Sequence, residues 1–329
     1  RYAAVPFDLK LTAEKLEPRI SADTLAEATL QPERLVIDAT IAYTIERAGV
    51  FRFDVDIPAG FRVTRVAGRE FNQFTPAMVD SHLVEPGDSP RLVVNLSKKA
   101  QGSIGLAVRL ERDLSEPDLL TPTGKTAEIP LPIPRPNPEG VERSAGRLIL
   151  YAPESLRVLP STREGLREIG LAESLQAIPS AREGGGATGT AVLAFAFTDE
   201  PASLDLAAER RRPQVTIRQL LVARVEEGVV KYRATLLYDV RYSSVKSLRL
   251  DVPAAVAADL RIETPGFREK AIEPAPKDLA DGYVAWQIAG EAELLGEGRI
   301  ELTWEDQLDK LEVGKPAEIE IPRLVPKDV

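Results

Sequence analysis

ATIAYTIERAGVFRFDVDIPA, residues 39–59, and ATLLYDVRYSSVKSLRLDVPA, residues 234–254, decide the fold. In both stretches apolar and polar side chains alternate, which is the period of a β-strand with one buried face and one wet face. Such alternation is typical of antiparallel sheets, in which one face packs on a core. The apolar positions that correspond are Ile41, Tyr43, Ile45, Phe53, Val55 and Ile57 with Leu236, Tyr238, Val240, Leu248, Leu250 and Val252.

The likeness between the two stretches continues outward in both directions. Residues 6–59 align with 201–254 without a gap, at an offset of 195. Farther along, Gly102 aligns with Gly296, and the Gly124-Lys125 pair aligns with Gly314-Lys315, at slightly smaller offsets. Small drifts of this kind are expected where loops gain or lose residues. We interpret the pattern as an internal duplication with a period of about 195 residues.

The predicted fold class is therefore all-β, with tandem antiparallel β-sandwich domains joined by a smaller β-rich segment. A proline-rich stretch, Ile133 to Pro138, predicts a stiff linker after the first sandwich. Ser161 and Glu164 have capping-box spacing and predict one short helix, running to Ile169. The expected divisions are 1–19 as the tail of a preceding repeat unit, 20–136 as the first sandwich, 137–213 as the small domain and 214–329 as the second sandwich.

Composition excludes several kinds of chemistry. The net charge of −9 argues against binding a phosphate backbone, and the one basic run, Arg210 to Arg212, is interpreted as a solvated edge. The chain has no cysteine and a single histidine, His82, which excludes thiolate sites and multi-histidine metal sites. No apolar run approaches the roughly 18 residues that a membrane-spanning helix needs. We therefore predict neither a nucleic-acid partner nor a transmembrane segment in this stretch.

Two glycine-rich motifs resemble phosphate-binding loops but lack the required context. The run from Gly184 to Gly189 satisfies G-x-G-x-x-G, yet a strand-like run follows it where a helix is needed. Gly124-Lys125-Thr126 resembles the end of a P-loop, but Leu119 stands where the first glycine of that motif belongs. We interpret the first as a loop and the second as a turn before a strand.

Carboxylates and the histidine offer equally weak signals. Asp54 and Asp56 lie on one strand face, but the equivalent of Asp54 is Arg249. Acidic strand ends, at Glu111 and at Glu305, could bind calcium, although no calcium-binding loop motif accompanies them. His82 lies near Asp80 and Ser81, and adjacent residues rarely converge into a triad. We therefore assign no catalytic, cofactor-binding or metal-ligating residue and expect no cofactor.

These observations favour a non-catalytic structural or interaction module, a fragment of a larger repeat-containing extracytoplasmic protein of the periplasm or cell surface. Its partners would be neighbouring repeat units of the same parent protein and other envelope proteins. The first alternative is an adhesin-like module that binds a protein or a glycan. The second is a hydrolase with a carboxylate site. An apolar patch exposed in one unit alone would favour the first alternative, and a deep pocket holding an acid of raised pKa the second.

Overall fold

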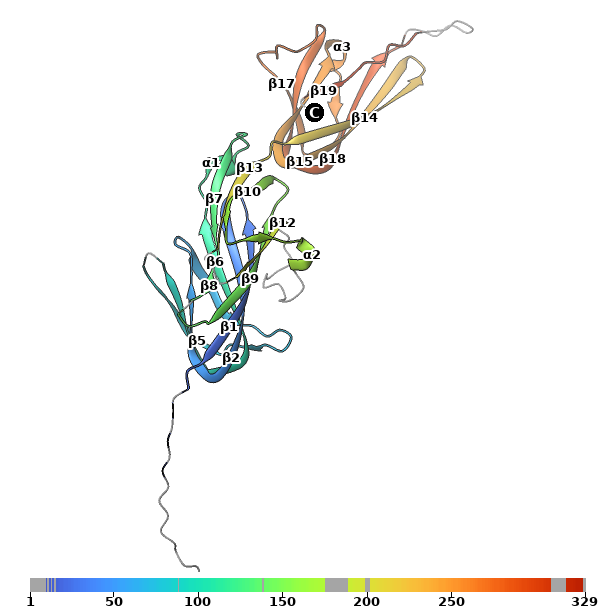
Figure 1. Ribbon diagram of the computed structural model, residues 1–329. Helices are drawn as coiled ribbons and strands as arrows, with labels where there is room; N and C mark the ends of the chain where they lie inside the picture. The colour runs from blue at the N-terminus through green and yellow to red at the C-terminus, as the bar shows by residue number, and fades with distance from the viewer. Residues whose placement is uncertain are drawn as a thin grey trace, which may run out of the picture. The chain divides into compact units, whose positions relative to one another are not determined.

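The computed structural model describes residues 10, 12, 14, 16–87, 89–137, 139–174, 189–198, 202–308 and 318–327. The chain divides into two compact units, the first mainly 1–121 with 125–210 and the second mainly 211–329 (Figure 1). Both units are built from β-strands, and the three helices among the described residues, two in the first unit and one in the second, are single turns. The chain is thus an all-β protein, as predicted. Most of the expected tail segment 1–19 lies outside the described residues.

The first unit combines a large sheet with a smaller one. The large sheet has the order β11-β12-β9-β1-β2-β6-β3, with β4 and β5 pairing with β6 and β8 pairing with β2, and the smaller sheet has the order β10-β13-β7. The strands are β1 (Arg19–Leu30), β2 (Arg34–Asp56), β3 (Arg62–Gly68), β4 (Thr75–Pro76), β5 (Val79–Glu85), β6 (Arg91–Asp113), β7 (Thr126–Pro132), β8 (Arg135–Pro136), β9 (Arg143–Ala152), β10 (Leu156–Glu164), β11 (Arg167–Glu168), β12 (Thr190–Thr198) and β13 (Ser203–Arg210). The helices are α1 (Pro117–Leu120) and α2 (Leu171–Ser174).

The alternation read from the sequence forms the core of this unit. Alternate apolar residues of β2, such as Ile37, Ile41 and Val55, and of β6, such as Leu92 and Leu110, belong to one buried cluster. Within it the Tyr43 and Phe53 rings stack with their centroids 4.1 Å apart. Burial of these side chains provides the main driving force for folding. The apolar runs at 34–46 and 50–57, and those at 91–96 and 104–112, are read from the sequence as separate strands. In the structure each pair is one long strand, β2 or β6, with an irregularity in its pairing.

The segment expected to form a separate small domain, 137–213, belongs to the first unit instead. Its strand β9 pairs in parallel with β1 over Ser21 to Thr29, and its strand β13 pairs with β7. Its apolar residues, Leu148 and Leu206 among them, join the same core as those of β2 and β6. The boundary expected after residue 136 is therefore wrong, because both sheets share this core and leave no division there.

Two local expectations within this segment are also wrong. Residues 161–164, expected to open a helix, continue strand β10, in which the Thr162 hydroxyl donates a hydrogen bond to Asp205 of β13. Cross-strand pairing with β13 thus overrides the capping-box signal, and the short helix of the segment is α2. The proline-rich stretch is not a free linker, because β8 pairs with the end of β2 and Asn137 is buried.

The second unit has one sheet, of order β14-β15-β18-β16, with β17 pairing with β18 and β19 pairing with β15. Its buried cluster contains both tryptophans of the chain, Trp286 and Trp304. The elements are β14 (Gln214–Glu226), β15 (Val229–Pro253), α3 (Ala254–Ala257), β16 (Arg261–Ile262), β17 (Phe267–Ala271), β18 (Tyr283–Gln307) and β19 (Val325–Lys327).

Strand pairing in the two units follows the sequence offsets. Arg19 pairs with Glu46 in the first unit, and Gln214 pairs with Arg241 in the second, each residue 195 positions after its counterpart. The irregularity after Ile45 recurs after Val240. Even the positive backbone φ of 64° at Arg47 recurs at Tyr242, with 70°. Strands β1, β2, β6 and β8 therefore correspond in register to β14, β15, β18 and β19.

Candidate functional site

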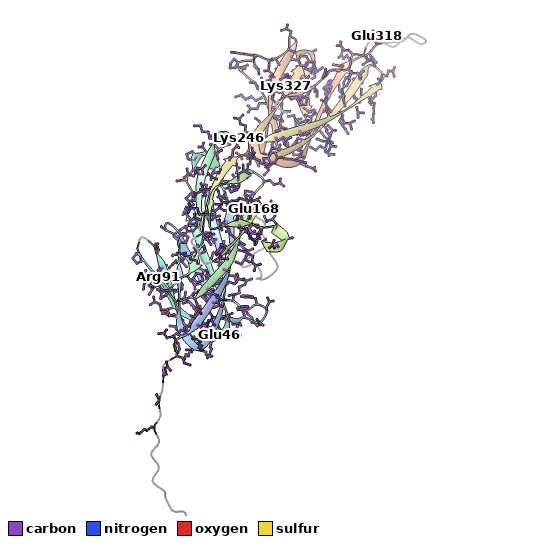
Figure 2. The ribbon with its side chains drawn as sticks, in the orientation of Figure 1. Glu46, Arg91, Glu168, Lys246, Glu318 and Lys327 are labelled. Carbon is purple, nitrogen blue, oxygen red and sulfur yellow. The ribbon has the colours of Figure 1, made fainter. Side chains whose placement is uncertain are left out.

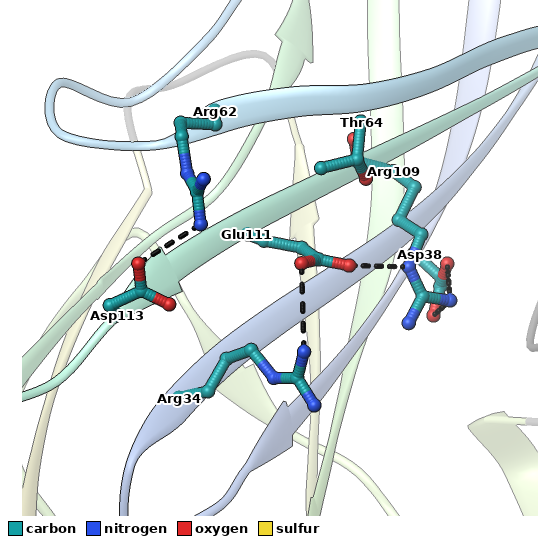
Figure 3. A network of polar contacts seen from close by, with 7 residues as sticks. All are labelled: Arg34, Asp38, Arg62, Thr64, Arg109, Glu111 and Asp113. Atoms are coloured by element: carbon teal, nitrogen blue, oxygen red, sulfur yellow. Dashed lines mark hydrogen bonds and ion pairs between the residues drawn. The ribbon is translucent and has the colours of Figure 1, made fainter.

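The densest polar cluster of the first unit spans β2, β3 and β6 (Figure 3). Arg109 donates hydrogen bonds to Glu111 at 3.0 Å and to Asp38 at 3.1 Å. Glu111 also faces Arg34 at 3.8 Å, while Arg62 binds Asp113 at 2.9 Å. Burial lowers the pKa of Arg109, but the hydrogen bonds and charges of Glu111 and Asp38 outweigh it, so that this pKa is raised. The carboxylates are thus held by arginines, an arrangement suited to cross-strand cohesion.

This cluster is not retained in the second unit. The equivalents of Asp38 and Arg34 are Arg233 and Val229, and the equivalent of Arg109 is Thr303, which pairs with Arg233 across the strands. Only Glu111 keeps its charge, as Glu305. A site shared by both units would keep its polar groups, so we interpret the cluster as local stabilisation of the first unit's sheet.

A further carboxylate is kept in both units, at the end of β2 and of β15. In the first unit the Asn137 side-chain amide donates to Asp56 at 2.7 Å. In the second unit Asp251 is buried and accepts hydrogen bonds from Arg249 at 2.9 and 3.1 Å, and Lys327 approaches it to 4.0 Å. Asp56 thereby holds Asn137, the residue that follows β8. Asp251 likewise lies beside Lys327, the residue that ends β19. These two acids are anchors for those strands.

The motifs weighed from the sequence do not converge into a site. His82 lies on β5 rather than in a loop, and its side chain is exposed. Gly124 has a φ of 79° and makes a turn, while residues 184–188 and 314–315 lie outside the described residues. Asp54 binds Arg52 at 2.6 Å. Across the described part of the chain, no group of three or more acidic or histidine side chains is placed to hold a metal ion.

A second, smaller buried cluster lies on the outer face of β1 and β2, the face turned away from the main core. It consists of Leu25, Ala42, Phe71, Ile149 and Tyr151, with Phe74 and Ala191 packed against them. Two of its members come from β9, which covers this part of β1 by parallel pairing. The buried Glu27 accepts a hydrogen bond from the Tyr151 hydroxyl at 3.1 Å. Strand β9 therefore completes both the edge and the outer face of β1.

Replacing Tyr151 by Phe should lower the free energy of unfolding of the first unit by about 1–2 kcal/mol, because a buried carboxylate loses a donor. Urea unfolding followed by circular dichroism measures this loss. The tryptophan fluorescence transition should stay unchanged, since both tryptophans belong to the second unit. An unaltered unfolding midpoint for the first unit would contradict the assigned hydrogen bond.

The same outer face is uncovered in the second unit. Leu220, Val222 and Leu237 correspond to Leu25, Glu27 and Ala42, and their side chains lie on one face because Leu237 pairs with Arg218. Leu220 is 60% exposed, whereas Leu25 is fully buried. Val222 is 51% exposed and Leu237 is 40% exposed. The sequence analysis missed this surface, although the offset of 195 aligns Leu220 with Leu25.

Other exposed large apolar side chains of the described residues, among them Phe51, Leu159 and Leu295, lie on different strands. Labelled charged side chains such as Glu46, Arg91, Lys246 and Lys327 come from different strands of both units (Figure 2). None of the helices described is long and apolar enough to cross a bilayer. The uncovered face of β14 and β15 is thus the strongest candidate for a binding surface.

Comparisons with known proteins give no assignment. No protein-family model matches the chain, and no curated protein matches it. A solved structure titled "Fcho1 Mu homology domain (Danio Rerio) with bound Eps15 peptide" is 11% identical, covers 95% of this chain and 84% of its own, and has a TM-score of 0.18. That TM-score provides no basis for transferring a fold or a function.

Proposed function

We propose that this chain is a non-catalytic structural and interaction module built from two related units. The observation that supports this most strongly is the identical register of β1–β2 and β14–β15, together with the loss of the first unit's polar cluster from the second. What the units share is scaffold: core positions, turns and the anchoring carboxylates Asp56 and Asp251. Shared scaffold with divergent polar groups is expected of repeat units that assemble rather than catalyse.

The proposal extends to an extracytoplasmic location and to partners among neighbouring repeat units and envelope proteins. A chain without cysteine avoids oxidative pairing in such a compartment. Protein partners are favoured over glycans, because the exposed side chains of the uncovered face are Leu220, Val222 and Leu237. Glycan-binding faces usually stack sugars on exposed aromatic rings, and this face has aliphatic side chains instead.

Thermal unfolding with calcium, magnesium or a chelator tests the non-catalytic, metal-independent character of the module. We expect each transition temperature to stay within about 1 °C under all three conditions. An ion that binds the folded state would instead raise the transition temperature by mass action. A rise of several degrees with millimolar calcium would contradict this proposal and favour a calcium-stiffened adhesive rod. Hydrolysis of glycosides or esters that persists after repeated purification would contradict it as well.

A further inference from the structure

Strand β14 has an open edge on the side that corresponds to the β9-paired side of β1 in the first unit. In the part of the chain that the structure describes, β14 pairs with β15 alone and ends the sheet order, at the margin of the second unit (Figure 1). Its counterpart β1 pairs with β2 on one side and with β9 on the other. Half of the backbone N–H and C=O groups of an edge strand point away from its neighbour and can pair with an added strand.

The outer face beside this edge has exposed apolar side chains that a strand added to β14 could cover. Leu25 is buried in the first unit within a cluster that includes Ile149 and Tyr151 of β9 together with Phe71. Leu220, its counterpart, has no such cover. Exposed apolar patches rimmed by polar groups commonly mark protein-binding surfaces.

Two charged positions on this face have the opposite sign in the second unit. Asp23 of β1 pairs with Arg147 of β9 at 3.6 Å, and the equivalent of Asp23 is Arg218. Asp38 is likewise replaced by the exposed Arg233. A strand that fits this face would thus carry an acidic residue where β9 carries Arg147.

The second unit also lacks the buried carboxylate that accepts a hydrogen bond from β9 in the first unit. Tyr151 reaches the buried Glu27 in the first unit, but the equivalent of Glu27 is Val222. An aliphatic side chain at the position of Tyr151 would therefore pack on Val222 without leaving a buried hydroxyl unsatisfied.

From these observations we infer that β14 binds an extended strand of a partner polypeptide, added in parallel as β9 is added to β1. The strand has aliphatic residues at successive central positions, like Leu148 to Leu150, and an acidic residue facing Arg218. By the equivalent register, its first residue lies beside Thr216 and its last beside Arg224, as Arg143 and Tyr151 lie beside Ser21 and Thr29. This inference rests on the proposed interaction role and specifies the chemistry and direction of the partner.

A fluorescein-labelled peptide with the sequence of residues 141–152, carrying Arg147→Glu and Tyr151→Val, tests the inference by anisotropy with the full chain. We expect saturable binding, at least about tenfold tighter than that of the unaltered peptide, which corresponds to roughly 1.4 kcal/mol. Leu220→Lys should weaken binding at least tenfold. Leu295→Lys is the matched control, because Leu295 is an equally exposed leucine of β18, and it should leave binding unchanged.

A spin label on the peptide's amino terminus tests the direction of the strand. Parallel addition predicts that amide signals near Thr216 broaden, whereas broadening near Arg224 would contradict it. Absence of binding, or equal binding by Leu220→Lys, would overturn the inference while leaving the metal-independence test of the proposed function untouched. Self-association of the chain without peptide, abolished by Leu220→Lys, would also overturn it, since the occupant would then be a second copy.

Discussion

Leu25→Ala should destabilise the first unit by about 3 kcal/mol, whereas Leu220→Ala should change the second unit by less than about 0.5 kcal/mol. The two residues occupy equivalent positions 195 residues apart, but Leu25 is fully buried and Leu220 is 60% exposed. Truncating a buried leucine removes its transfer free energy and leaves a cavity, at a typical cost of 2–5 kcal/mol. Exposed substitutions away from special features usually have small effects.

Differential scanning calorimetry combined with tryptophan fluorescence measures this contrast. Fluorescence follows the second unit, because Trp286 and Trp304 both lie on β18, and the calorimetric transition that it does not follow belongs to the first. Leu25→Ala should lower only that other transition. A comparable loss from Leu220→Ala would show that the outer face of β14 is covered in the protein, contrary to the structure.

Asp251→Asn should destabilise the second unit by about 2–3 kcal/mol. Asp251 is buried, and it accepts two hydrogen bonds from Arg249, whose side chain is also nearly buried. Hydrogen bonds to Asp251 and Asp278 raise the pKa of Arg249, which stays charged after the substitution. Removing one partner of a buried ion pair leaves an uncompensated charge, and the remaining pair with Asp278 offsets only part of that cost.

Asp278→Asn is the matched control, because the same arginine donates to this exposed carboxylate at 2.8 Å. Its effect should be much smaller than that of Asp251→Asn, as is usual for exposed ion pairs. The hydrogen bond from Arg249 lowers the pKa of Asp278. The contribution of Asp278 should therefore be present at neutral pH and disappear as the pH falls through its folded-state pKa. Equal effects of the two substitutions in urea unfolding would contradict the anchoring role of Asp251.

Alternation of apolar residues was sufficient to predict the strand conformation and the buried faces of β2 and β15. Ile41, Tyr43 and Ile45 are all buried together, because a half-buried strand leaves a period of two that survives in a single sequence. The offsets read from the sequence also predicted which residues occupy equivalent pairing positions. Where β2 and β6 continue through an irregularity, the polar residues between the apolar runs resembled a turn, and the sequence analysis split each strand in two.

Long-range pairing was beyond what the sequence could predict. Strand β9 pairs with β1 although more than a hundred residues separate them, and the sequence pattern of β9 does not predict which strand it pairs with. The boundary after residue 136 was expected for that reason, since prolines at 134 and 136 read as a linker. The candidate surface was missed for a related reason. Leu25 and Leu220 are both leucines at equivalent positions, and the sequence does not show that Leu25 is covered by other residues whereas Leu220 is exposed.

Amide hydrogen exchange along β1 and β14, followed residue by residue by NMR, tests the central claim most directly. The claim is that β1–β2 and β14–β15 pair in the same register, and that the edge of β14 that corresponds to the β9-paired edge of β1 stays open. Residues Leu25 to Thr29 should all be protected, because β1 is paired on both sides. Their equivalents, Leu220 to Arg224, should alternate between protected amides that face β15 and fast-exchanging amides that face outward. Continuous protection along β14 would contradict the open edge.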